Sequence, residues 1–114
     1  MKRSLRLSKS EQVWLSNYRH ALAKMRPQMV ERMLIYGSKA RGEGGSDSDL
    51  DVLLIVRNEA LAQKRDLRRM GYLLAGESDV VPSILAYTHD EWEQRKKSGS
   101  LFRQSVERDE VRIL

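Results

Sequence analysis

The chain has 114 residues, of which 40% are hydrophobic and 32% are charged, an ordinary balance for one globular domain spanning residues 1–114. The absence of cysteine excludes disulfides, thiol nucleophiles and thiolate metal sites, which fits a cytoplasmic protein. No apolar stretch approaches the roughly 20 residues that cross a membrane, and we expect no signal peptide, because no continuous apolar segment follows the basic N-terminus.

The formal net charge of +5 favours attraction to a nucleotide, to RNA or to an acidic protein surface. The basic residues gather toward both ends of the chain and are not interleaved with aromatic side chains. Nucleic-acid binding therefore stays open as a minor alternative.

The first part of the chain predicts a helix, a strand and a short second helix. Ser8 and Glu11 have the spacing of a capping box, and Pro27 ends the helical pattern, so we expect a helix over residues 9–26. Apolar residues at helical spacing give this helix its core-facing side: Trp14, Tyr18, Leu22 and Met25. An apolar run then predicts a strand over 30–36, and Ser38 opens a short helix over 38–42.

The second part alternates in the same way. The expected elements are a strand over 50–56, a helix over 59–75, a strand over 79–87, helices over 89–98 and 100–108, and a short final strand over 111–114. Pro82 makes the third strand an edge or a distorted strand, because proline cannot donate to a ladder. The order of these helices and strands predicts an α/β (α+β) fold with a mixed β-sheet flanked by helices.

The most informative stretch joins the first two expected strands. Gly37 and Ser38 end the first apolar run near a helix N-terminus, where phosphate oxygens bind readily. Asp49 and Asp51 begin the second strand and lie on one of its faces, because successive side chains alternate. Two adjacent carboxylates repel each other, and a hard divalent cation such as Mg²⁺ relieves that repulsion. The stretch therefore predicts a metal-dependent site that uses a nucleotide.

Three other motifs fit this stretch less well. The spacing from Gly37 to Gly42 starts like a P-loop, but the Lys and Ser/Thr that a P-loop requires do not follow. The glycine pattern of dinucleotide-binding folds is also absent. Asp47 could begin an EF-hand loop with Asp49 and Asp51, but the required Gly and Glu are missing. We interpret Asp47 as a solvated residue, because it sits within the loop itself.

The residues of this stretch resemble those of nucleotidyltransferases of the DNA polymerase β superfamily. That pattern is a hydrophobic residue, Gly-Ser, a gap of about ten residues and then Asp-x-Asp, here Gly37-Ser38 and Asp49-Leu50-Asp51. The longer string over residues 37–51 is similar to the minimal nucleotidyltransferases, the stand-alone MNT type. Residues 88–114 also resemble that type, with a Glu-Trp helix followed by Gly-Ser-Leu-Phe.

The resemblance implies the residues of the site. Asp49 and Asp51 would hold two Mg²⁺ ions, while Gly37 and Ser38 would grip the phosphates of a nucleoside triphosphate. The third carboxylate of the family, on the next strand, corresponds to Asp79, which would contact the catalytic metal and help to deprotonate the acceptor; Glu77 fits that place less well. Arg41, and with less weight Lys39, could add phosphate contacts.

The resemblance also implies an activity and a partner. The family transfers a nucleoside monophosphate to a hydroxyl group and releases pyrophosphate, and we expect ATP to be the donor. Stand-alone MNT proteins resemble antitoxins that add AMP to a tyrosine of a HEPN-type toxin encoded nearby. Two alternatives are a small-molecule acceptor such as an aminoglycoside, and an antitoxin that neutralises its partner by occlusion without catalysis.

Overall fold

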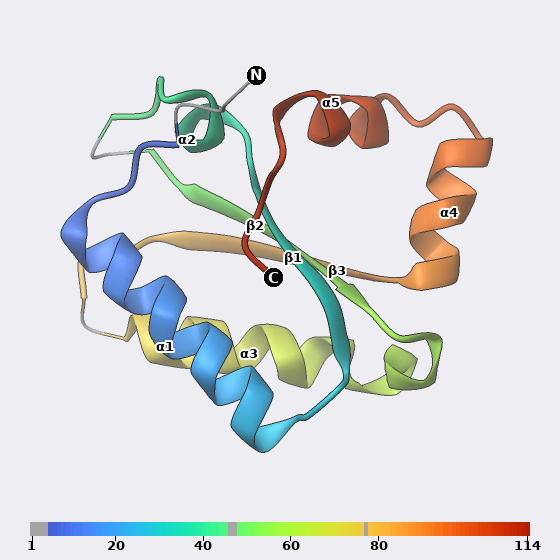
Figure 1. Ribbon diagram of the computed structural model, residues 1–114, viewed down its shortest axis with the longest axis horizontal. Helices are drawn as coiled ribbons and strands as arrows, with labels where there is room; N and C mark the ends of the chain where they lie inside the picture. The colour runs from blue at the N-terminus through green and yellow to red at the C-terminus, as the bar shows by residue number, and fades with distance from the viewer. Residues whose placement is uncertain (1–4, 46–47, 77) are drawn as a thin grey trace.

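A four-stranded mixed sheet forms the centre of the chain (Figure 1). The computed structural model describes residues 5–45, 48–76 and 78–114. The strands run in the order β3-β2-β1-β4; they are β1 (Val30–Tyr36), β2 (Leu50–Val56), β3 (Pro82–Thr88) and β4 (Val111–Arg112). β1 is antiparallel to β2 and to β4, whereas β2 and β3 are parallel, so the predicted mixed sheet is confirmed.

Helices cover both faces of this sheet. They are α1 (Lys9–Met25), α2 (Ser38–Arg41), α3 (Lys64–Ala75), α4 (His89–Lys97) and α5 (Leu101–Asp109), with the 3₁₀ helix η1 (Asn58–Gln63). Side chains of α1 and α3 pack on one face with Met33, Ile35 and Val52. Side chains of α4 and α5 pack on the other face with Leu34, Leu53 and Ile55. Figure 1 shows α1 and α3 below the sheet and α4 and α5 on its other side.

The alternation of side chains along β2 decides which face carries the candidate site. Leu50, Val52 and Leu54 point into the core beneath α1 and α3. Leu53 belongs to the core beneath α4 and α5, and Asp51 shares its parity along the strand. Asp51 therefore lies on the α4/α5 face, at the end of β2 that follows the loop from α2.

Two capping boxes set the starts of α1 and α4. The hydroxyl of Ser8 accepts from the N–H of Glu11, and the N–H of Ser8 donates to Oε1 of Glu11 at 2.8 Å. Thr88 and Glu91 make the same reciprocal pair at the start of α4. Each box satisfies two N–H groups that the first turn of a helix leaves without partners.

The structure differs from the sequence-based expectation at several places. The side chain of Met25, expected in the core stripe, is 59% exposed, because it lies in the last turn of α1 beyond the buried Leu22. The helix expected over 59–75 divides into η1 and α3, with non-helical backbone angles at Ala60. The strand expected from residue 79 begins at Pro82.

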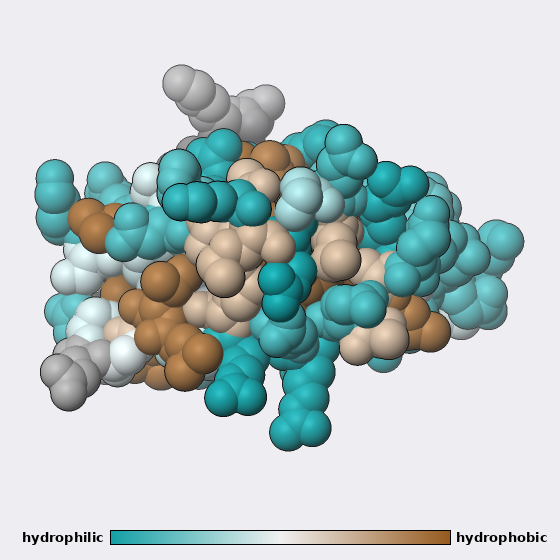
Figure 2. All heavy atoms as spheres, turned by 90° about the horizontal axis from the view of Figure 1, so that it is seen from below, coloured by the Kyte–Doolittle hydropathy of each residue, from teal (hydrophilic) through white to brown (hydrophobic). Residues whose placement is uncertain are grey.

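The outer face of α1 and α3 carries exposed apolar side chains. These are Val13, Met25, Tyr72, Leu73 and Leu74. Figure 2, which views the molecule from this side, shows apolar residues gathered in its left half. Among the described residues, no helix has the length and the apolar character needed to cross a membrane.

The packing of α1 on α3 depends on the absence of a side chain at Gly71. The carbonyl of Gly71 accepts from Nε1 of Trp14 at 2.9 Å, so the two helices approach closely there. A Cβ at Gly71 would stand 2.7 Å from the ring of Tyr18 and 2.5 Å from Cδ1 of Ile84. The ring of Tyr18 is itself fixed, since its hydroxyl donates to the carbonyl of Leu67.

We expect Gly71→Ala to lower the free energy of unfolding by about 1–2 kcal/mol, because overpacking outweighs the better helix propensity of alanine. Urea titration followed by tryptophan fluorescence measures this change. Gly45→Ala is the matched control, because a Cβ there meets no atom within 4 Å. Equal stability of the two variants would contradict the overpacking argument.

Candidate active site

The turn at Gly37 brings the backbone of the chain against the carboxylate of Asp51. Gly37 has φ 76° and ψ −158°, a backbone conformation that residues other than glycine rarely adopt. Tyr36 and Asp51 are paired residues of β1 and β2, so the turn begins directly beside Asp51. A Cβ at Gly37 would stand 3.3 Å from Cγ of Asp51 and would overlap its Oδ2. Both the backbone conformation and the space therefore require glycine.

Asp49 and Asp51 form a pair of neighbouring carboxylates, as the strand alternation predicts. Asp49 is exposed just before β2, and Asp51 is partly buried within it. Burial raises the pKa of Asp51, and the negative charge of Asp49 raises it further. The charge of Arg41 acts in the opposite direction and lowers the pKa of Asp51. The pair thus carries an electrostatic repulsion that a cation would relieve.

A row of polar side chains crosses the sheet at Asp51. Asp51 is paired with Tyr36 on β1 and with Ser83 on β3. Burial raises the pKa of the Tyr36 hydroxyl, and the charge of Asp51 contributes to the same shift, so the phenol stays protonated at neutral pH. The ring of Tyr36 also packs edge-on against Phe102 of α5, with 5.6 Å between centroids.

Asp79 does not lie on the strand where the sequence-based analysis places it. It is exposed and precedes the first residue of β3, Pro82, in a turn where the N–H of Val80 donates to Oγ of Ser78. Among the described residues, no three His, Cys, Asp or Glu side chains gather closely enough to hold a metal ion. The expected convergence of Asp79 on Asp49 and Asp51 is therefore not found in this structure.

Ser83 is the residue that the sequence-based analysis missed. The sequence alone contained no signal for it, because the parallel register that pairs Asp51 with Ser83 is set by the packing of β2 against β3. Asp47 and Glu77, considered above, lie outside the described residues.

The two cations of α2 have different environments. Lys39 is 4% exposed and its Nζ lies 2.9 Å from Oε2 of Glu11, so it ties α2 to α1 and is not free to contact a phosphate. The guanidinium of Arg41 remains partly exposed, and its Nη1 donates to Oδ2 of Asp109 at 2.7 Å. Arg41 is therefore the cation of this helix that can reach a ligand.

The segment after α2 folds back over Ser38. Gly42 has a left-handed conformation and ends the helix, and the N–H groups of Glu43 and Gly44 then donate to the carbonyl of Ser38. A Cβ at Gly44 would stand 2.9 Å from Oγ of Ser38 and 2.7 Å from Oγ of Ser48. The Ser38 hydroxyl is thus held close to the loop that leads to Asp49.

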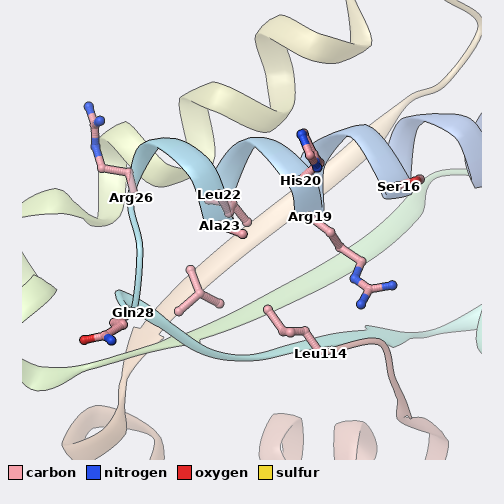
Figure 3. A pocket seen from close by; sticks show the side chains of 9 residues that line it. Ser16, Arg19, His20, Leu22, Ala23, Arg26, Gln28 and Leu114 are labelled. Carbon is pink, nitrogen blue, oxygen red and sulfur yellow. The ribbon is translucent and has the colours of Figure 1, made fainter.

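A pocket of about 450 Å³ lies away from these residues, beside α1. Its apolar lining residues Leu22 and Val30 belong to the α1/α3 core, on the sheet face opposite Asp51. Figure 3 shows that the side chains of His20 and Arg26 point away from the centre of this pocket. Arg26 is also engaged by Asp66 at 2.7 Å. His20 and Arg26 therefore do not converge on one ligand in this pocket.

A sequence profile of the nucleotidyltransferase domain family matches residues 15–110, a span that includes the Gly37 turn, the carboxylate pair and Ser83. The chain belongs to this nucleotidyltransferase family. No curated protein matches the sequence.

One solved structure resembles the chain, that of a candidate nucleotidyltransferase from Sulfolobus solfataricus, with 18% sequence identity and a TM-score of 0.48. The match covers 94% of this chain and 87% of that one. A likeness at this level carries no information about activity.

We expect Asp51→Asn to stabilise the free protein at neutral pH. A carboxyl group whose folded-state pKa is raised binds its proton more tightly in the folded chain, so stability falls as the pH rises from its ordinary pKa of 3.8 through the folded value. Asparagine removes this loss of stability. The stability gained by Asp51→Asn relative to the wild type should therefore shrink toward the acidic end of the range. Urea midpoints measured from about pH 4 to 8 test this pH dependence.

Asp90→Asn is the control for the change in net charge, because Asp90 is exposed in the first turn of α4. That position favours a negative charge, so the control should gain no stability. Two results would contradict this electrostatic account. One is an Asp51→Asn protein that is less stable than the wild type at neutral pH, and the other is a gain in stability that is the same at all pH values.

Proposed function

We propose that the nucleotidyltransferase activity of this family takes the form, in this chain, of Mg²⁺-dependent transfer of AMP from ATP to a hydroxyl group. The observation that carries the proposal is the position of the Asp51 carboxylate against the backbone of Gly37, with Asp49 beside it. A metal-binding carboxylate and a phosphate-binding turn must lie this close together to act on one triphosphate.

The donor set suits magnesium. Mg²⁺ prefers hard oxygen ligands and is usually held by one or two carboxylates together with substrate phosphates and water. Asp49 and Asp51 supply that number of carboxylates, one exposed and one partly buried. When bound, the ion would neutralise phosphate charge and polarise the reacting phosphorus. A second ion remains a proposal from the family resemblance, because Asp79 does not join the pair.

The turn and α2 would hold the triphosphate. The first N–H groups of α2 have no acceptor within the helix, and the hydroxyl of Ser38 lies in the same turn. Arg41 adds a planar cation suited to phosphate oxygens. Together these groups would fix the β- and γ-phosphates and leave the α-phosphate directed toward the carboxylate pair.

The reaction is an in-line displacement at the α-phosphorus. The acceptor hydroxyl oxygen forms a new bond to that phosphorus, the bond to the bridging oxygen of the β-phosphate breaks, and pyrophosphate leaves. The hydroxyl proton is released in the same reaction. The chain contributes by positioning and by neutralising charge, and no covalent enzyme intermediate is required.

The proposed acceptor is a tyrosine of a HEPN-type toxin encoded nearby, so that the chain acts as an antitoxin. The similarity of residues 37–51 to minimal nucleotidyltransferases supports this assignment. A docked partner protein would then supply the part of the site that positions the acceptor.

We expect the chain to transfer label from α-³²P-ATP to the product of the neighbouring gene when Mg²⁺ is present. Asp49→Asn and Asp51→Asn should each reduce transfer by at least about 100-fold, because they remove ligands of the metal that neutralises the transition state. Gel autoradiography and mass spectrometry of the acceptor measure the transfer and locate the modified residue.

Asp90→Asn should transfer at the wild-type rate, and so should Asp79→Asn, because Asp79 is exposed before β3 and no three acidic side chains form a metal-holding group among the described residues. Label appearing on an added aminoglycoside but not on the protein would change the acceptor class. Absence of transfer to any acceptor, with the Asp49→Asn variant indistinguishable from the wild type, would refute the proposed activity.

A further inference from the structure

A buried carboxylate, Asp109, lies at the last residue of α5, 2% exposed. The C-terminal end of a helix carries a partial negative charge, so an aspartate there is unfavourable by itself. A buried charge is tolerated only when it is paired. The placement of Asp109 is therefore explained by its partners and not by the local preferences of the helix.

Its partners are two arginines. Nη1 of Arg41 donates to Oδ2 of Asp109 at 2.7 Å, across 68 positions of sequence. Arg108, the preceding residue, donates from Nε at 3.1 Å and from Nη2 at 3.2 Å. These hydrogen bonds lower the pKa of the Asp109 carboxyl group, so it remains ionised at neutral pH.

The pairing with Arg41 reaches the candidate active site directly. The N–H of Arg41 donates to the carbonyl of Gly37 at 3.2 Å, so Arg41 closes the turn that lies against Asp51. Its side chain is held at two points, by Asp109 through Nη1 and by Glu43 through Nε at 3.3 Å. Within the described part of the chain, Nη2 donates to no acceptor, so it is available to a ligand.

We propose that Asp109 is a positioning residue that fixes the guanidinium of Arg41 beside the Gly37 turn, so that it can bind the triphosphate. The inference rests on the function proposed above. Arginine loses side-chain conformational freedom when it is immobilised. Asp109 imposes that order before the nucleotide arrives, which is the general way in which preorganisation raises affinity.

A purely structural role for Asp109 is the competing explanation, since the same hydrogen bond ties α5 to α2. The two roles differ in one measurable respect. A positioning residue acts through Arg41, so its removal should have no further effect once Arg41 is gone. A structural tie would lower the free energy of unfolding but would leave the affinity of the folded protein for Mg·ATP unchanged.

The test is a double-mutant cycle on the dissociation constant for Mg·ATP, measured by calorimetry at a temperature where each protein is folded. It compares the wild type with Arg41→Gln, Asp109→Asn and the double variant. We expect Asp109→Asn to weaken binding about tenfold in the wild-type background and by less than about twofold in the Arg41→Gln background.

Arg108→Gln is the matched control, because Arg108 is the other partner of Asp109 and its side chain is exposed. It should leave the affinity for Mg·ATP within about twofold of the wild type. If Asp109→Asn does not fold, Asp109→Glu takes its place, since it keeps the carboxylate. Affinity of that variant close to the wild type supports the proposal, and a tenfold loss in the folded protein overturns it.

The outcomes separate this inference from the proposed function. A wild-type protein that binds Mg·ATP while Asp109→Asn binds equally well, or loses affinity equally in both backgrounds, overturns the positioning role alone. A wild-type protein that does not bind Mg·ATP overturns the proposed function, and the positioning role with it.

Discussion

The close approach of the Gly37 backbone to the Asp51 carboxylate is the constraint on which the candidate site depends. It requires glycine for two independent reasons, since the backbone adopts a positive φ and a side chain would overlap Asp51. It also joins two chemical requirements at one point, because the carboxylate can bind a cation while the adjoining turn can bind the anion that the cation accompanies. Burial and the negative charge of Asp49 both raise the pKa of Asp51, so the ionised carboxylate is unfavourable there in the free protein.

The short helix α2 holds this geometry because it is attached to the rest of the fold on two sides. Lys39 forms a buried ion pair with Glu11 of α1, and Arg41 forms a partly buried one with Asp109 of α5. The same Glu11 completes the capping box of α1, so one side chain begins a helix and anchors the turn. Four residues of helix have little stability of their own, and these long-range contacts supply what local propensity cannot.

The sequence was sufficient to predict the mixed sheet. Local patterns also predicted the starts of α1 and α4, through their capping boxes, and the proximity of Asp49 to Asp51, through strand alternation. The sequence was not sufficient to predict the position of Asp79, since one aspartate before an apolar run does not reveal where the strand begins. The parallel register of β2 and β3 decides that point, and it pairs Asp51 with Ser83. The burial of Lys39 likewise could not be predicted from the sequence, because it depends on a contact with a distant helix.

The most direct measurement is diffraction from crystals grown with Mn²⁺ and a non-hydrolysable ATP analogue, using the anomalous signal of manganese to locate the ion. The expected result is an anomalous peak within coordination distance of both Asp49 and Asp51, with the triphosphate against Gly37 and Ser38. A metal and nucleotide bound elsewhere, or a triphosphate at the turn without any ion on the carboxylate pair, would contradict it.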